Sequence, residues 1–124
     1  MPCTVVVGGF FGDEGKGKII SHLALKDKPK LTVRGGVGPN AGHTVEYMGK
    51  TYRLRMIPCG FIYTPTRLLI GPGVLVNPKV FLSEVESTGT KGRVAVDRQC
   101  PIIEERHIQQ EVESEHLAKK IGST

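Results

Sequence analysis

The chain has 124 residues, 39% hydrophobic and 23% charged, a composition typical of one soluble globular domain and unlike that of a disordered or fibrous protein. Its net charge of +5 comes from residues 1–60, which hold nine Lys and Arg against four Asp and Glu, whereas residues 61–124 hold eight of each. Because dense basic clusters and interleaved aromatic residues are missing from the sequence, this distribution favours a small polyanion such as a nucleotide over a nucleic acid.

Cysteine usage and hydropathy bear on the cellular compartment. Cys3, Cys59 and Cys100 are widely spaced and form no C-x-x-C pair, so the sequence indicates neither a disulfide framework nor a zinc site. No basic-then-apolar leader opens the chain, and no run approaches the roughly 18 apolar residues of a membrane span. We therefore expect a cytoplasmic protein without a membrane partner.

The N-terminal third is predicted to form a strand, a glycine-rich loop, a helix and a second strand. The β-branched run 4–7 ends at Gly8, which is typical of a buried strand that leads into a loop. Apolar residues recur at helical spacing over residues 15–26, and the apolar run 31–33 leads into another glycine-rich loop, residues 35–42. This β-α-β order favours a parallel sheet.

The rest of the chain adds a hairpin, two strands and two helices. Residues 44–47 and 51–57 alternate on either side of Met48-Gly49-Lys50 and predict an antiparallel hairpin. The other expected elements are a strand over 67–70, a helix from Pro78 after an Asn77 N-cap to a stop at Gly89, a strand over 93–96 and a helix over 104–120.

These elements together predict the α/β class. We expect a mostly parallel sheet with flanking helices, a strand–loop–helix resembling a P-loop at the N-terminus, and a β-hairpin. Residues 1–124 would form a single, partial nucleotide-binding domain. The ending Gly122-Ser123-Thr124, after a predicted helix, is typical of the start of another loop, so we expect the protein to continue beyond it.

The first glycine-rich loop has the spacing of a phosphate-binding loop. Residues 12–18, G-D-E-G-K-G-K, fit G-x-x-x-x-G-K. Backbone N–H groups at the start of the following helix can hold oxyanions, and Lys16 and Lys18 add positive charge. Ile19, however, stands where Ser or Thr would offer a hydroxyl to Mg²⁺. The alternative interpretation is a glycine-rich turn with solvated lysines.

Two carboxylates, Asp13 and Glu14, lie at the centre of this loop. A carboxylate about 4 Å from a phosphate oxygen costs about 4 kcal/mol at an effective dielectric constant near 20 unless something neutralises it. Mg²⁺ bridging carboxylate and phosphate would remove that cost and replace the hydroxyl missing at Ile19. Alternatively, a carboxylate takes a proton from a nucleophile that attacks the γ-phosphate. Either use makes the loop catalytic.

The second loop carries Asn40, Gly42 and His43. Asn can hydrogen-bond a base, a glycine carbonyl can approach a ligand or metal closely, and His can protonate an oxyanion near neutral pH. Taken by itself, the pattern favours a tight turn with a surface histidine. On the predicted hairpin, Arg53 and Arg55 face the same side and could add to an anion site, although exposure to solvent is the simpler interpretation.

Together the two loops resemble those of the adenylosuccinate synthetase family, whose N-terminal region carries G-D-E-G-K-G-K followed by N-A-G-H-T. The resemblance extends through Ile57-Pro58-Cys59-Gly60, similar to the family's I-P-S-G, through residues 70–74, and through Ile121-Gly122-Ser123-Thr124, similar to the start of I-G-T-T-G-x-G. It departs at Phe10-Phe11, where many members have Gln-Trp. It covers the whole chain, but only the front of the family's longer chain.

The resemblance implies a GTP-dependent ligase of purine biosynthesis that acts as a homodimer. It would join IMP and L-aspartate to form adenylosuccinate through a 6-phosphoryl-IMP intermediate. Asp13 would be the general base for the N1 proton of IMP and, with the Gly42 carbonyl, a Mg²⁺ ligand. His43 would be the acid that stabilises the transferring phosphoryl group. The GTP-phosphate contacts would be Gly12, Glu14, Gly15, Lys16, Gly17, Lys18, Gly42, His43 and Thr44. The IMP contacts would be Asp13, Glu14, Gly15, Lys16, Asn40, Ala41, Gly42, His43 and Thr124.

Two other interpretations stay open. A non-catalytic phosphate- or nucleotide-binding module would keep both loops, and it gains weight because the family's guanine-recognition, aspartate-binding and cross-dimer arginine residues lie beyond Thr124. A basic nucleic-acid-binding domain is the weaker alternative. The remaining histidines, His22, His107 and His116, are interpreted as structural or solvated, because none has the i, i+4 spacing of a helical metal pair.

Overall fold

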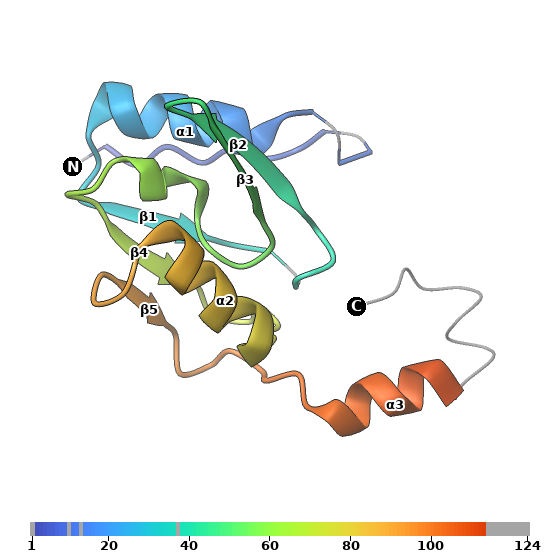
Figure 1. Cartoon of the computed structure of the whole chain (residues 1–124). Helices are drawn as coiled ribbons and strands as arrows, with labels where there is room; N and C mark the ends of the chain where they lie inside the picture. The colour runs from blue at the N-terminus through green and yellow to red at the C-terminus, as the bar shows by residue number, and fades with distance from the viewer. Residues whose placement is uncertain (1, 10, 13, 37, 114–124) are drawn as a thin grey trace.

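The structure is a computed structural model that describes residues 2–9, 11–12, 14–36 and 38–113. A parallel sheet of order β1-β4-β5 is formed by β1 (Leu31–Arg34), β4 (Arg67–Ile70) and β5 (Val94–Val96) (Figure 1). An antiparallel hairpin is formed by β2 (His43–Tyr47) and β3 (Lys50–Leu54). The predicted α/β class, with a parallel sheet and a separate hairpin, is confirmed.

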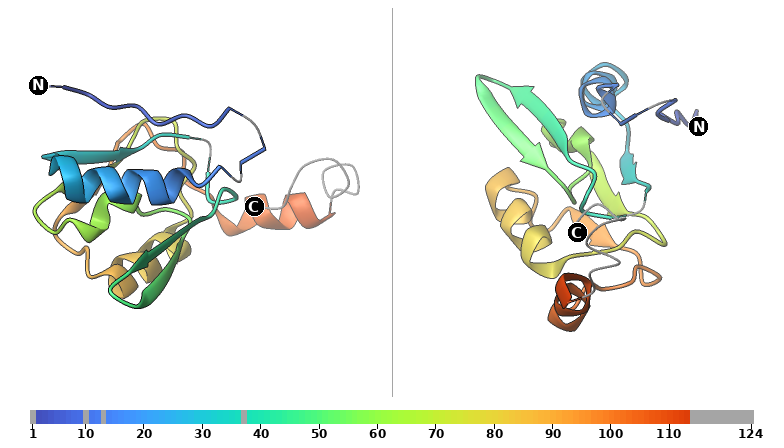
Figure 2. Two further views of the ribbon diagram at one scale, coloured as in Figure 1. Left: turned by 90° about the horizontal axis from the view of Figure 1, so that it is seen from above. Right: turned by 90° about the vertical axis from the view of Figure 1, so that its right-hand side faces the viewer.

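Helices surround these two sheets. The α-helix α1 (Lys16–Asp27) contacts β2 and the short 3₁₀ helix η1 (Cys59–Ile62). The helix α2 (Pro78–Thr88) connects β4 to β5, so β4, α2 and β5 form a β-α-β unit. The helix α3 (Glu105–Glu113) buries none of its residues and extends away from the rest of the fold (Figure 2). No helix in the described ranges is long and apolar enough to span a membrane.

Local sequence explains the ends of several elements. The Asn77 side chain accepts hydrogen bonds from the backbone N–H groups of Lys79 and Val80, at 3.1 and 3.2 Å, and caps α2 as predicted. The same helix ends at Gly89, whose φ of 63° lies in the left-handed region. In the hairpin, Met48 and Gly49 both have positive φ, 49° and 74°, as a tight two-residue turn requires.

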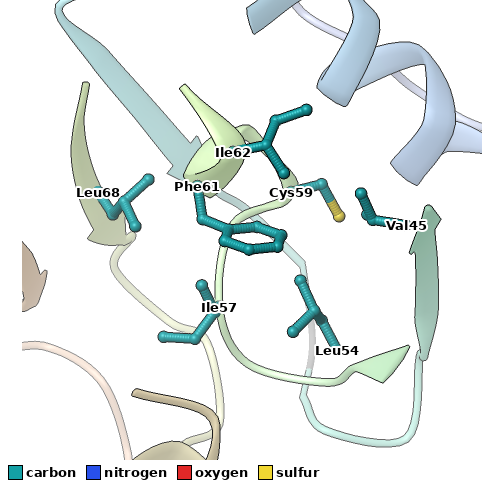
Figure 3. Packing of buried hydrophobic residues seen from close by; sticks show 7 residues of the cluster. All are labelled: Val45, Leu54, Ile57, Cys59, Phe61, Ile62 and Leu68. Carbon is teal, nitrogen blue, oxygen red and sulfur yellow. The ribbon is translucent and has the colours of Figure 1, made fainter. Parts of the chain in front are cut away.

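The main core joins the hairpin to the parallel sheet. Its buried residues, shown in Figure 3, are Val45, Leu54, Ile57, Cys59, Phe61, Ile62 and Leu68. A second buried cluster consists of Met56, Ile70, Val74 and Val76. Because Val45 and Leu54 come from the two strands of the hairpin, this packing anchors β2, and with it the second loop, to the body of the protein.

One predicted element is wrong: residues 4–7 form no strand. Val5 and Val7 are 76% and 81% exposed, and β1 stands at one end of the sheet order. A β-branched run becomes a strand only where a neighbouring backbone pairs with it and a surface covers it, and β-propensity alone supplies neither. The loop and helix of the predicted strand–loop–helix are therefore present without the strand. The end of the predicted 104–120 helix lies outside the described residues.

Candidate functional site

The first loop turns into α1 at a glycine. Gly12 and Gly15 have φ values of 94° and 79°, a conformation that L side chains rarely adopt. The Gly15 carbonyl accepts the first hydrogen bonds of α1, from Lys18 N and Ile19 N at 3.0 and 3.2 Å. No side chain in the described part of the chain caps this end of α1. The helix therefore begins with backbone N–H groups that suit an anion. Asp13 lies outside the described residues.

Lys16, the first residue of α1, pairs with Glu14. Lys16 Nζ lies 2.7 Å from Glu14 Oε2, and the two side chains are 25% and 24% exposed. The pair lies close to Gly8, where an added Cβ would stand 2.6 Å from Lys16 Nζ and 2.7 Å from Glu14 Oε1. Gly8 thus makes room for the pair. An anion at Lys16 would compete with the Glu14 carboxylate for the ammonium group.

The second loop is held from behind by arginines. Arg34, buried at the end of β1, donates from Nη2 to the carbonyl oxygens of Gly38 and Ala41, both at 3.1 Å. Arg55 Nε donates to the Pro39 carbonyl at 2.5 Å. Arg55 is exposed, as predicted, but its side chain also binds this loop. Within the loop, Asn40, Ala41 and Gly42 are exposed.

Arg34 was missed by sequence reasoning, although its position at the end of a predicted strand, directly before a glycine-rich loop, was visible. Its Nε is buried and has no hydrogen-bond acceptor among the described residues. A buried donor without an acceptor costs about 1–3 kcal/mol. Burial also lowers the pKa of Arg34, while the nearby Cys59 and Glu84 act in the opposite direction.

The two loops meet where α1 packs against β2. Gly17 is buried, and a Cβ added there would lie 3.1 Å from His43 Cβ and 3.3 Å from Cys59 Sγ. One turn further along, Ser21 Oγ shares its hydrogen between the carbonyls of Gly17 and Cys59, at 2.8 and 3.0 Å. The first turn of α1 and the start of β2 are therefore in direct contact. Of the predicted phosphate-site residues of the first loop, the structure brings Gly17 together with His43 and Thr44.

Positive charge converges on His43. Burial lowers the pKa of His43, and the positive charges of Arg34 and Lys16 lower it further. Those two cations come from β1 and α1, and His43 from β2, so three separate elements contribute to one cationic site. Such a site favours an anionic ligand, because the charges of Lys16 and Arg34 attract an anion, and a bound anion would stabilise the protonated form of His43.

Glu84 is a second residue that sequence reasoning missed. It is buried on α2, where its Oε1 accepts from Arg55 N at 2.6 Å and its Oε2 accepts from the N–H groups of Met56 and Ile57, at 2.9 and 2.8 Å. One carboxylate thus holds three successive amides of the segment between β3 and η1. The sequence offered one sign that Glu84 is buried: it lies three positions after Phe81, on the apolar side of the predicted helix.

The other titratable residues do not join this site. Burial raises the pKa of the Cys59 thiol to about 11, so it is protonated and unreactive at neutral pH. His22 is exposed, and His107 Nδ1 accepts the Glu104 N–H at 3.1 Å. Within the described ranges, no group of three or more His, Cys, Asp or Glu could hold a metal ion. Thr124 and His116 lie outside those ranges, so the predicted IMP contact at Thr124 stays a prediction.

The fold and the two loops define an α/β protein with a candidate anion site at the N-terminus of a helix. Its sequence matches the family model of adenylosuccinate synthetase over residues 5–124. The chain belongs to the adenylosuccinate synthetase family.

Relatives share both the sequence and the fold. The chain is 60% identical over 124 residues to adenylosuccinate synthetase of Archaeoglobus fulgidus, covering all of this chain and 37% of that protein. A solved structure of fully ligated adenylosuccinate synthetase from Plasmodium falciparum matches 81% of this chain and 24% of its own, with a TM-score of 0.71 and 34% identity. The succinoaminodeoxyadenylate synthetase of cyanophage S-2L, solved with dGMP and with dATP as energy donor, matches 82% of this chain and 29% of its own, with a TM-score of 0.70 and 27% identity.

Proposed function

We propose that this chain forms the phosphate-handling part of a GTP-dependent ligase that joins IMP and L-aspartate to form adenylosuccinate. The observation that carries the proposal is the contact between the N-terminus of α1 and His43, with Lys16 and Arg34 both close enough to lower the pKa of His43. Phosphoryl transfer needs aligned reactants and neutralised charge more than covalent help, and this site supplies both. The relatives' shared name supports the choice of substrates.

In the proposed reaction, Asp13 takes the N1 proton of IMP, which makes the purine 6-oxygen nucleophilic. That oxygen forms a bond to the γ-phosphorus of GTP as the bond from phosphorus to the β,γ-bridging oxygen breaks and GDP leaves. The amine of L-aspartate then displaces phosphate from carbon 6. His43, neutral in the free site, offers a hydrogen bond to the transferring group.

The remaining proposed contacts follow the two loops. Amides and side chains of Gly12, Glu14, Gly15, Lys16, Gly17, Lys18, Gly42, His43 and Thr44 would hold the GTP phosphates. The IMP site would be formed by Asp13, Glu14, Gly15, Lys16, Asn40, Ala41, Gly42, His43 and Thr124. Lys16 would share its ammonium group between Glu14 and the phosphates, because a lysine ammonium has three N–H donors and Glu14 Oε2 is one acceptor.

Mg²⁺ fits the donors that the chain offers. The Asp13 carboxylate and the Gly42 carbonyl are both hard oxygen ligands of the kind that Mg²⁺ prefers. Gly42 is exposed, and an added Cβ there would have no neighbour nearer than the Leu54 carbonyl oxygen at 4.0 Å, so its surroundings leave room. When bound, the ion would neutralise phosphate charge beside the loop carboxylates. We also propose that the protein acts as a homodimer.

The test uses the complete gene product and follows adenylosuccinate formation from IMP, GTP and L-aspartate. Asp13→Asn should lower kcat by about 100-fold or more, because proton transfer by a positioned base contributes on that scale. Asp27→Asn, at the exposed end of α1, is the matched control and should retain activity. Full activity in the Asp13→Asn variant would contradict the assigned base.

The same assay separates the alternatives. Turnover with dGMP and dATP but not with IMP and GTP would place the chain with the cyanophage relative in substrate choice. Nucleotide binding without turnover of any of these substrates would favour a non-catalytic module. Salt-sensitive binding to generic DNA, with no response to nucleotides, would favour a nucleic-acid-binding domain.

A further inference from the structure

Three neighbouring carbonyl groups of the second loop are bound by arginine side chains. Arg34 Nη2 donates to the carbonyls of Gly38 and Ala41, both at 3.1 Å, and Arg55 Nε donates to that of Pro39 at 2.5 Å. The two arginines come from different elements, because Arg34 ends β1 and Arg55 follows β3. The backbone of residues 38–41 is therefore tied at both sides.

Gly38 and Pro39 are buried, but the loop residues that follow them are not packed into the core. Asn40, Ala41 and Gly42 are exposed and contribute nothing to either buried cluster. A glycine-rich backbone has many conformations to lose when it binds a ligand, and restraining it beforehand improves affinity. Arg34 achieves this at a cost in stability, since its buried Nε has no acceptor among the described residues.

We propose that Arg34 is a positioning residue: with Arg55, it binds the carbonyls of Gly38, Pro39 and Ala41 and so presents Asn40 and His43 to the substrate in a fixed geometry. The proposal rests on the proposed function for the identity of the ligand, IMP. It assigns Arg34 no contact with substrate, and its effect on affinity passes through the loop.

Lysine cannot take over this role. The Lys Nζ would stand at about the position of the Arg34 guanidinium carbon, one bond short of Nη2, and could not reach the carbonyls of Gly38 and Ala41 together without movement of the loop. Arg34→Lys therefore keeps the positive charge near His43 and removes the two-carbonyl contact. This separates positioning from simple electrostatic attraction.

The experiment measures amide hydrogen exchange over residues 38–43 and the affinities for IMP and GTP in the complete gene product. In Arg34→Lys, exchange in this segment should be faster while exchange in β4 is unchanged, and IMP affinity should fall about tenfold. GTP affinity should fall by less than IMP affinity, because most of the proposed GTP-phosphate contacts lie in the first loop, which is intact. Unchanged exchange and unchanged IMP affinity would overturn the proposal, as would an equal loss for both nucleotides.

Arg55→Met provides a second variant in case Arg34→Lys fails to fold, because Arg55 is exposed. Its matched control is Arg53→Met, an exposed arginine two residues earlier on β3. Faster amide exchange over residues 38–43 in Arg55→Met but not in Arg53→Met supports the proposal. Identical exchange in these two variants overturns it. If the unmodified protein binds no IMP, the proposed function fails while the exchange experiment still tests the arginine contacts.

Discussion

The buried carboxylate of Glu84 fixes the backbone of residues 55–57. Both of its carboxylate oxygens are used, one for the Arg55 N–H and the other for those of Met56 and Ile57. Hydrogen bonds to a charged acceptor are about twice as strong as neutral ones, and a buried carboxylate is tolerated only when its oxygens are satisfied. The segment 55–57 is held in this way, and Arg55, which binds the second loop, is held with it.

Glu84→Gln should destabilise the protein by about 2 kcal/mol or more, because the amide NH₂ would face backbone N–H donors in place of an oxygen. Urea denaturation of the variant and of the unmodified protein measures the difference in free energy of unfolding. Glu86→Gln, an exposed glutamate on the same helix, is the control and should change stability by less than about 0.5 kcal/mol. Equal stability of the two variants would contradict this account of Glu84.

His43 should titrate below the ordinary histidine value of 6.5, since burial and the charges of Arg34 and Lys16 all disfavour its protonated form. The unfolded chain then binds more protons in the range between the two values, so the folded state loses stability as the pH falls below 6.5. NMR titration of the His43 ring measures its pKa directly. Added pyrophosphate should raise that pKa, and a value above 6.5 without any anion would show that the cations do not converge there.

At the scale of elements, η1 packs closely on β1. Gly60 of η1 is buried, and a Cβ added there would lie 2.7 Å from Thr32 Cγ2 and 2.9 Å from Thr32 Cβ. Contacts this short require one element to shift. The close approach places Cys59 against Gly17 of α1, so the fit of η1 on β1 also sets where the first turn of α1 lies.

Gly60→Ala should lower the free energy of unfolding by about 1–3 kcal/mol, the usual cost of overpacking a dense interior. Thermal and urea denaturation would measure it. Gly9→Ala is the matched control, because an added Cβ at Gly9 meets nothing within 4 Å and its φ is not positive. If Gly60→Ala were as stable as the control, the contact between η1 and β1 would be looser than the structure indicates.

At the scale of the whole molecule, two buried clusters hold the hairpin, η1, β4 and the residues that follow β4 together. The N-terminal segment and one edge of the sheet are less well covered. Val5 and Val7 are 76% and 81% exposed, and Leu31 and Val33 of β1 are each 48% exposed. The chain spans 37% of the length of its Archaeoglobus fulgidus relative.

The sequence alone determined the features that depend on neighbouring residues. The strand 67–70, the Asn77 cap and Gly89 stop of α2, and the hairpin around Met48 and Gly49 all follow from propensity, capping and turn chemistry, which act within a few residues. The two loop motifs were also visible, because their glycines and charged residues are contiguous. Family membership followed from those motifs.

Only the tertiary structure decided how distant residues meet. It left residues 4–7 without a strand partner, and it placed Arg34 behind the second loop and Glu84 beneath residues 55–57. These contacts join residues far apart in the chain, and whether a polar side chain is buried depends on what packs over it, which no local pattern encodes. The residues that hold the loops in place were therefore hidden in the sequence, while the loops themselves were not.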